Sequence, residues 1–266
     1  MAAGVYSVEV DRRQGVDVYC LREGKRARAE LVPAFGSNLV SFVAGAPVLE
    51  EVPFEALAAK PTSYGIPVLF PFPNRVRDGA FAFGGRTFRV DPPRHGFVRD
   101  KPWEVVGSGA SADDGAWVTT GISAAEHPDT ILSQFPFPFR LELTWGLRDA
   151  TLELRATARN LGEETMPAGF GIHPYFRRPE TGTVRVPARR RWVLTDSLPT
   201  GERVEVEGKY DLRRPVELAS LELDDVLTDL ETDRDGRVRC VLADESLRRR
   251  TIIEFDPAEL PEVVVY

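Results

Sequence analysis

The feature that most constrains the fold is a regular alternation of apolar and polar residues. Residues 139–147 read FRLELTWGL and residues 151–159 read TLELRATAR, with only Arg148, Asp149 and Ala150 between them. A period of two places every second side chain on the same face of an extended strand. The two segments therefore predict an antiparallel hairpin with one buried face.

Shorter segments elsewhere repeat this alternation, and turn-forming Gly, Pro, Asp and Asn residues lie between them. Only residues 52–60 and 219–230 leave room for short helical turns. The pattern predicts an all-β protein built as a large antiparallel β-sandwich, with a barrel as the alternative. No linker or repeat interrupts the chain, so we expect residues 1–266 to form a single domain. The alternating segments are 5–10, 16–21, 27–32, 86–90, 237–243 and 249–255.

Composition narrows the partners and the location. The net charge is −7, with acidic and basic residues interspersed, which is unlike the basic face of a nucleic-acid-binding protein. No apolar run approaches the roughly 18–20 residues that cross a bilayer. The N-terminus MAAGVYSVEVDRRQG lacks the layout of a signal peptide, so we expect a cytoplasmic protein without nucleic-acid or membrane partners. Cys20 and Cys240 lie within strand-like runs, where we expect buried thiols.

Two stretches contain an imidazole beside glycine and an aromatic residue. One is RHGF with His95, and the other is MPAGFGIHPYF with His173. Glycine lets a backbone approach a ligand closely, and histidine transfers protons near neutral pH. A lone histidine is often structural, so His95 alone indicates little. His173, between a glycine-rich lead and Pro174, favours a functional role.

Two further stretches carry polar groups suited to hydroxyl binding. Residues 65–79 read GIPVLFPFPNRVRDG and present Asn74 and Arg75, although an ordinary turn would also contain such residues. Residues 221–230 read LELDDVLTDL, in which Asp224 and Asp225 point to opposite sides of an extended segment. The 3 histidines show no metal-ligand spacing, so we expect no metal site, and no phosphate-binding or nucleophile-elbow motif is present.

Taken in order, these stretches resemble those of the aldose 1-epimerase (galactose mutarotase) family. PFPNRVRDGAFAFGGRTFRV is similar to the family's Asn-Arg segment. RHGFVRDKPWEV and MPAGFGIHPYF are similar to its two histidine motifs, and LDDVLTDL is similar to its late acidic segment. PFPFRLELTWGL and PEVVVY also resemble family strands. The resemblance covers nearly the whole chain.

The resemblance implies a galactose-mutarotase-like β-sandwich of the supersandwich type that interconverts the α and β anomers of a free aldohexose without cofactor or metal. His173 would be the general acid on the ring oxygen, and His95 would bind or polarise the sugar. Asn74, Arg75 and Asp224 would hold hydroxyl groups, with Asp225 as the alternative to Asp224. The partner would be a monosaccharide, and the sequence predicts no oligomeric state.

The chain departs from the family pattern at its end. The family's catalytic base is a glutamate beyond the strand that VVVY resembles, and this chain stops at Tyr266. We therefore expect a chain shortened from a longer natural protein, a truncated gene, or a homologue without this base. Two alternatives stay open: a non-catalytic sugar-binding or regulatory protein, and a hexose-6-phosphate 1-epimerase in which Arg77, Arg94 and Arg99 bind the phosphate.

Overall fold

A computed structural model describes residues 5–266, which form β-strands joined by turns and one α-helix, α1 (Phe54–Ala59). The chain separates into two compact units, Met1–Arg177 and Arg178–Tyr266. Each unit has its own buried core, because each contains a pair of sheets with apolar faces. That both units belong to one domain stays a prediction from the sequence.

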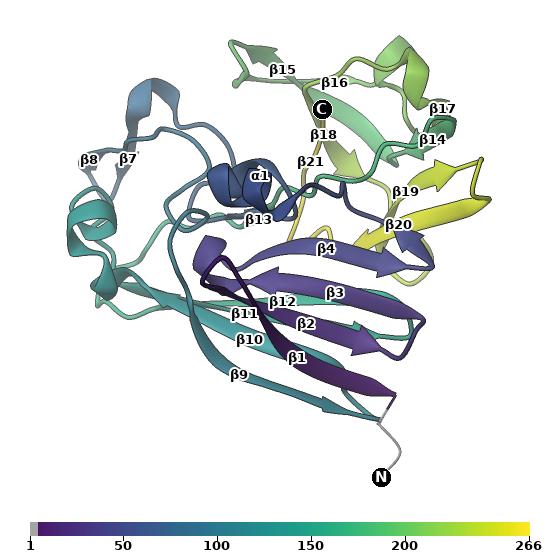
Figure 1. Cartoon of the computed structure of the whole chain (residues 1–266). Coiled ribbons are helices and arrows are strands. Elements are labelled where there is room, and N and C mark those ends of the chain that lie inside the picture. The colour runs from purple at the N-terminus through teal and green to yellow at the C-terminus, as the bar shows by residue number, and fades with distance from the viewer. Residues whose placement is uncertain (1–4) are drawn as a thin grey trace. The chain divides into compact units, whose positions relative to one another are not determined.

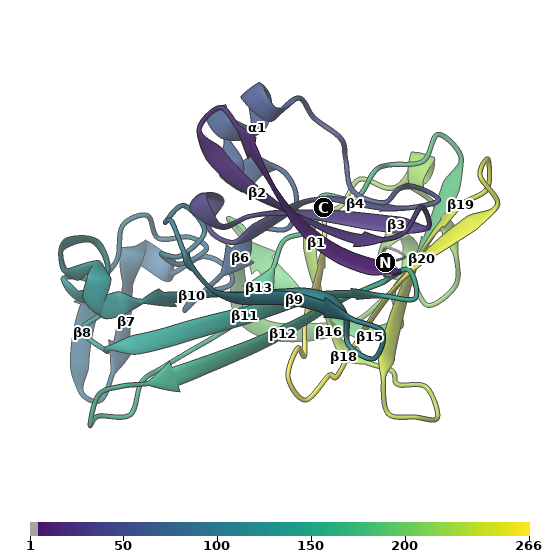
Figure 2. The same cartoon turned by 60° about the horizontal axis from the view of Figure 1, so that its bottom comes forward.

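The first unit is a sandwich of two antiparallel sheets, which lie one above the other in Figure 2. In the first sheet the strands follow chain order, and in the second the order is β12-β11-β10-β9 (Figure 1). The first sheet contains β1 (Tyr6–Arg13), β2 (Val16–Glu23), β3 (Ala27–Val32), β4 (Asn38–Ala44) and β5 (Ala46–Pro47). The second contains β9 (Glu104–Ser111), β10 (Gly115–Ser123), β11 (Phe139–Arg148) and β12 (Thr151–Asn160).

The predicted hairpin is confirmed as β11 and β12, which pair from Phe139 opposite Asn160 to Arg148 opposite Thr151. Every second residue of β11 is buried, whereas β12 has none buried because it is the edge strand of its sheet. The buried face of β11 packs with the first sheet, where Trp145 shares a cluster with Leu21 and Leu31. Burial of such side chains is the main stabilising contribution in a two-layer fold.

A second cluster of the first unit is rich in phenylalanine and supports the loops between the sheets. The hairpin of β7 (Ala80–Phe83) and β8 (Arg86–Arg89) contributes Phe81 and Phe88, whose rings stack 5.1 Å apart. Phe72 meets Phe135 edge to face at 5.7 Å and contacts Phe97 at 6.0 Å. Phe72 and Phe97 flank the segments with Asn74 and His95, so this packing holds both segments in place.

The second unit also contains two four-stranded antiparallel sheets, with orders β17-β14-β19-β20 and β16-β15-β18-β21. Its core includes Val186, Leu212, Leu227 and Val238. The first sheet contains β14 (Gly182–Arg185), β17 (Val216–Glu217), β19 (Val238–Asp244) and β20 (Arg249–Phe255). The second contains β15 (Ala188–Thr195), β16 (Leu198–Glu205), β18 (Asp225–Leu230) and β21 (Val263–Val265).

The helical expectations had mixed outcomes. Residues 52–60 contain α1, which is 6 residues long, far short of the roughly 20 that span a bilayer; no helix in the described chain could cross one. Residues 219–230 contain only the end of a 3₁₀ turn (Leu218–Ser220) before β18 begins. The expectation of helical turns therefore holds only for the start of this segment, because β18 pairs with both β15 and β21 and buries Val226 and Leu227.

Both cysteines are free and buried. Burial raises the pKa of Cys20, and it raises the pKa of Cys240 to about 11, because a thiolate loses solvation in an apolar surrounding. We expect neither thiol to react with a disulfide reagent at pH 8 within minutes in the native protein, and both to react at once in denaturant. Absorbance of the released thiol measures this. Fast labelling of one thiol in the native state would show that its strand opens.

Candidate active site

A short ladder positions His173. The strands β6 (Val68–Leu69) and β13 (Gly171–Ile172) pair antiparallel, and the pairing continues past them. The His173 N–H donates to the Pro67 carbonyl at 3.0 Å, and the Tyr175 N–H donates to the Gly65 carbonyl at 2.8 Å. The backbone of the second histidine motif is therefore fixed on both sides of the imidazole.

A tight backbone approach positions His95. The His95 N–H donates to the Asn74 carbonyl at 3.1 Å, and the Phe97 N–H donates to the Phe70 carbonyl at 2.9 Å. His95 and Gly96 both have left-handed backbone angles, with φ of 67° and 68°. A Cβ on Gly96 would overlap the Phe70 carbonyl group. Only glycine fits there, which explains the Gly in RHGF.

The two ladders bring the imidazoles together. The ring centroids of His95 and His173 lie 5.9 Å apart, and the ring planes cross at 81°. The Tyr175 ring stacks on His173, with centroids 4.8 Å apart and planes inclined by 25°. Both imidazoles are half-buried, so neither is sealed in the core. At this separation the two imidazoles are close enough for both to contact one small ligand.

The hydrogen bond of His95 defines its tautomer. Its Nδ1 lies 3.1 Å from the Pro73 carbonyl oxygen, which can only accept a hydrogen bond. Nδ1 therefore carries the proton in the neutral ring, and Nε2 is left as an acceptor. Burial lowers the pKa of His95 to about 4. The hydrogen bond to Pro73 opposes this shift, and the charges of Arg99, His173 and Arg94 each add a smaller lowering of the pKa. His95 is thus neutral at pH 7 and accepts a hydrogen bond through Nε2.

This pKa predicts an acid-sensitive fold. An exposed histidine has a pKa of 6.5, so between pH 6.5 and about 4 the unfolded chain binds a proton that folded His95 does not. The contribution of neutral His95 to the free energy of unfolding is therefore fully present above pH 6.5 and decreases as the pH falls through this window. Asparagine tolerates the left-handed backbone of this position and does not titrate. We therefore expect the free energy of unfolding of His95→Asn to decrease by about 1–2 kcal/mol less than that of the wild type on acidification, after allowance for solvent screening of a half-buried ring. Urea unfolding at pH 7 and pH 4.5 measures it, and equal losses in both proteins would contradict it.

Asn74 and Arg75 lie on the segment that pairs with the first histidine motif. The Asn74 Oδ1 accepts the Arg75 N–H at 2.8 Å, and Arg75 pairs with Arg94 in an isolated antiparallel bridge. The Val76 N–H also donates to the Pro93 carbonyl at 2.8 Å. Asn74 is half-buried and Arg75 is exposed. The structure thus brings Asn74, Arg75, His95 and His173 into one neighbourhood of the first unit.

Asp224 lies in the second unit, and its place in the site stays a prediction. It is exposed and directly precedes β18, while Asp225, the first residue of that strand, is half-buried and pairs with Val265. The Asp224 N–H donates to the Asp225 carboxylate at 3.4 Å. Asp224 therefore has the more accessible carboxylate of the two.

Sequence reasoning missed two side chains beside the imidazoles. Tyr175 received no role, although a residue two positions from His173 in an extended segment lies on the same side of it. Arg99 was considered only for phosphate binding, yet it is close enough to His95 to lower the pKa of that imidazole. Among residues 5–266, no group of three or more His, Cys, Asp or Glu side chains is arranged to hold a metal ion.

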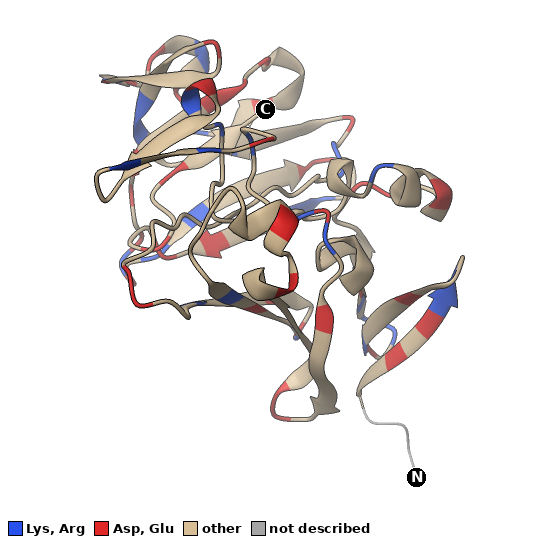
Figure 3. Cartoon of the chain, turned by 90° about the vertical axis from the view of Figure 1, so that its left-hand side faces the viewer, with Lys and Arg blue, Asp and Glu red and all other residues tan. Residues whose placement is uncertain are grey.

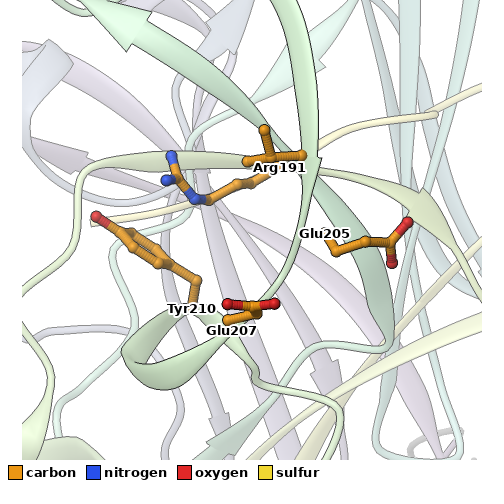
Figure 4. A pocket seen from close by; sticks show the side chains of 5 residues that line it. Arg191, Glu205, Glu207 and Tyr210 are labelled. Carbon is orange, nitrogen blue, oxygen red and sulfur yellow. The ribbon is translucent and has the colours of Figure 1, made fainter.

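The second unit contains a hollow of about 340 Å³ (Figure 4). Arg191, Val204, Glu205, Glu207 and Tyr210 line it. The Arg191 guanidinium lies 4.0 Å from the centre of the Tyr210 ring, and Glu205 accepts a hydrogen bond from Arg190 at 2.9 Å. No histidine lines this hollow, so it lacks an imidazole that could transfer a proton near neutral pH. The imidazole pair is therefore the better candidate for acid–base catalysis.

The family model described as aldose 1-epimerase matches residues 17–266. The chain belongs to the aldose 1-epimerase family. This confirms the resemblance drawn from the ordered motifs, and it supports epimerase-type activity on sugars at the level of the family.

Two curated relatives of this aldose 1-epimerase family member come from Escherichia coli K12, and both are described as uncharacterized. YphB is 26% identical over 158 residues, which cover 56% of this chain and 50% of YphB. YihR is 27% identical over 119 residues, which cover 41% of this chain and 35% of YihR. The matched segments therefore span half or less of these relatives.

Solved structures show the same fold. A galactose mutarotase-like protein from Clostridium acetobutylicum has a TM-score of 0.83 at 23% identity, covering 95% of this chain and 81% of its own. Slr1438 from Synechocystis has a TM-score of 0.68 at 26% identity, covering 97% and 93%. Galactose 1-epimerase from Lactobacillus acidophilus has a TM-score of 0.70 at 16% identity, covering 90% and 78%. The predicted fold class, an antiparallel β-sandwich of the galactose-mutarotase type, is confirmed.

Proposed function

We propose that the protein is an aldose 1-epimerase that interconverts the α and β anomers of a free aldohexose. The observation that carries the proposal is the pair of half-buried imidazoles, His95 and His173, whose ring centroids are 5.9 Å apart beside Asn74 and Arg75. The family assignment and the neighbours described as galactose mutarotase-like support a sugar substrate.

The reaction needs two proton transfers. The ring oxygen gains a proton while the anomeric hydroxyl gives its proton to water, and the bond between C1 and the ring oxygen breaks to give an open-chain aldehyde. Rotation about C1–C2 presents the other face of the aldehyde, and the reverse transfers close the ring as the other anomer. In this proposal His173 donates the proton to the ring oxygen and recovers it on closure, because an imidazole can do both near neutral pH.

The other residues bind and orient the sugar. Neutral His95 accepts a hydrogen bond from a sugar hydroxyl through Nε2, since its Nδ1 is engaged by Pro73. Arg75, with its fixed fork of donors, and the Asn74 amide hold further hydroxyl oxygens. Asp224 keeps its predicted role as an acceptor of a hydrogen bond from a sugar hydroxyl. Such positioning contributes to catalysis by holding the ring oxygen against the acid.

Polarimetry of freshly dissolved α-D-glucose and α-D-galactose tests the proposal. We expect the rate of approach to anomeric equilibrium to increase in proportion to protein concentration. Exchange NMR should show direct interconversion of the α and β anomeric signals. Calorimetric titration with the same sugars runs in parallel. Saturable sugar binding without anomer exchange above the buffer rate would indicate a non-catalytic sugar-binding protein. If the protein neither binds these sugars nor accelerates their exchange, the carbohydrate function is contradicted.

A further inference from the structure

The strand β12 has an outer edge without a partner strand. It pairs with β11 over 10 residues in one unbroken register, and no strand of the described chain pairs with its other side (Figure 2). The opposite edge strand of the sheet, β9, contains Gly107 and Gly109, and its register with β10 shifts between Thr119 and Thr120. Bulges of this kind discourage an edge from pairing with another chain. β12 contains no bulge, glycine or proline, so its edge is open to a further strand.

The hydrogen bonds to β11 identify the backbone groups at this edge. The Leu161 N–H, directly after β12, donates to the Pro138 carbonyl at 2.8 Å. Such bonds recur at every second residue of an antiparallel pair, so the odd-numbered residues of β12 bond to β11. The even-numbered residues therefore direct their N–H and C=O groups away from the sheet. These residues are Leu152, Leu154, Ala156, Ala158 and Asn160.

The charges of β12 are incomplete within one chain. Arg159 is exposed and lies directly opposite Arg140 of β11, an arrangement of like charges that destabilises a ladder. Acidic and basic residues are interspersed along the strands (Figure 3), and Arg140 binds Glu142 at 2.9 Å, but Arg159 forms no ion pair within residues 5–266. Nearer the start of β12, exposed Glu153 accepts hydrogen bonds from Arg155 at 2.9 and 3.1 Å.

We propose that β12 pairs antiparallel with β12 of a second copy of this chain, about a two-fold axis at Ala156. The sheet then continues from one copy into the other, and the outward backbone groups of both strands bond to each other. This register sets Glu153 of each copy opposite Arg159 of the other copy, so the dimer contains two such pairs. The carboxylate of Glu153 has lone pairs left for a second arginine. Each unpaired Arg159 thus gains an acidic partner.

The sequence of β12 selects this register. It also sets Leu154 opposite Ala158 and Arg155 opposite Thr157, so no like charges face each other. An axis at Arg155 would set that residue opposite its own copy, and an axis at Thr157 would set Arg155 opposite Arg159. An axis nearer either end of the strand would leave more of its residues unpaired.

Charge reversal tests the interface. Sedimentation analysis over a range of concentrations should show the wild-type protein in a monomer–dimer equilibrium. Glu153→Arg and Arg159→Glu each replace two attractive pairs by two repulsive ones, and each should raise the dissociation constant at least about tenfold. The double variant Glu153→Arg/Arg159→Glu exchanges the charges and should restore the dissociation constant to within about threefold of wild type.

Disulfide trapping tests the position of the axis. Two Ala156→Cys chains would have these residues directly opposite each other, about 5.5 Å apart between Cα atoms, which a disulfide spans. Ala158→Cys is the matched control on the same face of the strand, because its two copies would be offset by roughly 13 Å along the strands. Mild oxidation should give a covalent dimer of Ala156→Cys and none of Ala158→Cys. Cys20 and Cys240 are buried and do not compete.

The inference does not depend on the proposed function, since none of these measurements uses a sugar. A wild-type protein that stays monomeric up to about 1 mM would overturn it. So would a dimer whose dissociation constant neither charge reversal changes, or equal trapping of the two cysteine variants. Thermal unfolding confirms that the variants fold, and if a charge variant does not fold, the two cysteine variants decide.

Discussion

Replacing His173 by glutamine is expected to slow anomer exchange by about 10²–10⁴-fold, the contribution of a well-placed acid or base. Glutamine retains a hydrogen-bonding head of similar reach but cannot donate and recover a proton near neutral pH. The backbone at this position is held by the bond from the His173 N–H to the Pro67 carbonyl, which the substitution does not remove. We therefore expect the fold to persist and kcat to fall more than KM changes.

The third histidine provides the matched control for this substitution. His127 lies outside both histidine motifs, in the segment between a 3₁₀ turn (Ala124–Glu126) and the turn that follows it. His127→Gln removes the same imidazole chemistry and is expected to leave the exchange rate within about twofold of wild type. If His173→Gln also changes the exchange rate by no more than about twofold, the general acid is another group.

Replacing Gly96 by alanine is expected to be among the most damaging single changes in the chain. The added Cβ would overlap the carbonyl group of Phe70, and the residue would also keep a φ of +68°, which alanine rarely adopts. Left-handed strain and a backbone collision together should cost at least about 3 kcal/mol. Thermal unfolding should then occur about 6–12 °C lower, and the displacement of His95 should remove activity as well.

A second glycine separates the collision from the strain. Gly85, in the turn between β7 and β8, has a φ of +75°, but a Cβ there would have nothing within 4 Å. Gly85→Ala should therefore cost only about 1 kcal/mol, or about 2–4 °C, and leave activity intact. Equal shifts in the two variants would contradict the close approach of the Gly96 backbone to Phe70.

Local alternation was sufficient to predict the long strands. The segments 27–32 and 249–255 coincide with β3 and β20, because a strand with one buried face must alternate. Residues 219–230 were misjudged because the pairing of β18 with two neighbours overrides weak local preference. The separation into two compact units left no linker signal, because the chain passes from Arg177 to Arg178 without a change in composition.

The candidate site was accessible from ordered motifs but not from periodicity. The strands that align the two histidine segments, β6 and β13, are 2 residues each, too short to display any alternation. The bridge between Arg75 and Arg94 lies outside any strand, so no alternating pattern in the sequence predicts it. The lowered pKa of His95 depends on burial and on Arg99 and Arg94, which are effects of tertiary packing. The first histidine motif could be recognised from the sequence because the left-handed backbone at Gly96 requires glycine, which gives the motif a fixed residue beside His95.

One measurement tests the central claim, that His95 and His173 address the same small sugar, without depending on turnover. The protein has 3 histidines, so its imidazole ¹⁵N resonances can be assigned with single His→Gln variants. On titration with glucose and glucose 6-phosphate, the resonances of His95 and His173 should move together and saturate at one dissociation constant, while those of His127 stay in place. Movement of only one of the pair, or of His127 instead, would show that the two imidazoles do not form a common sugar site.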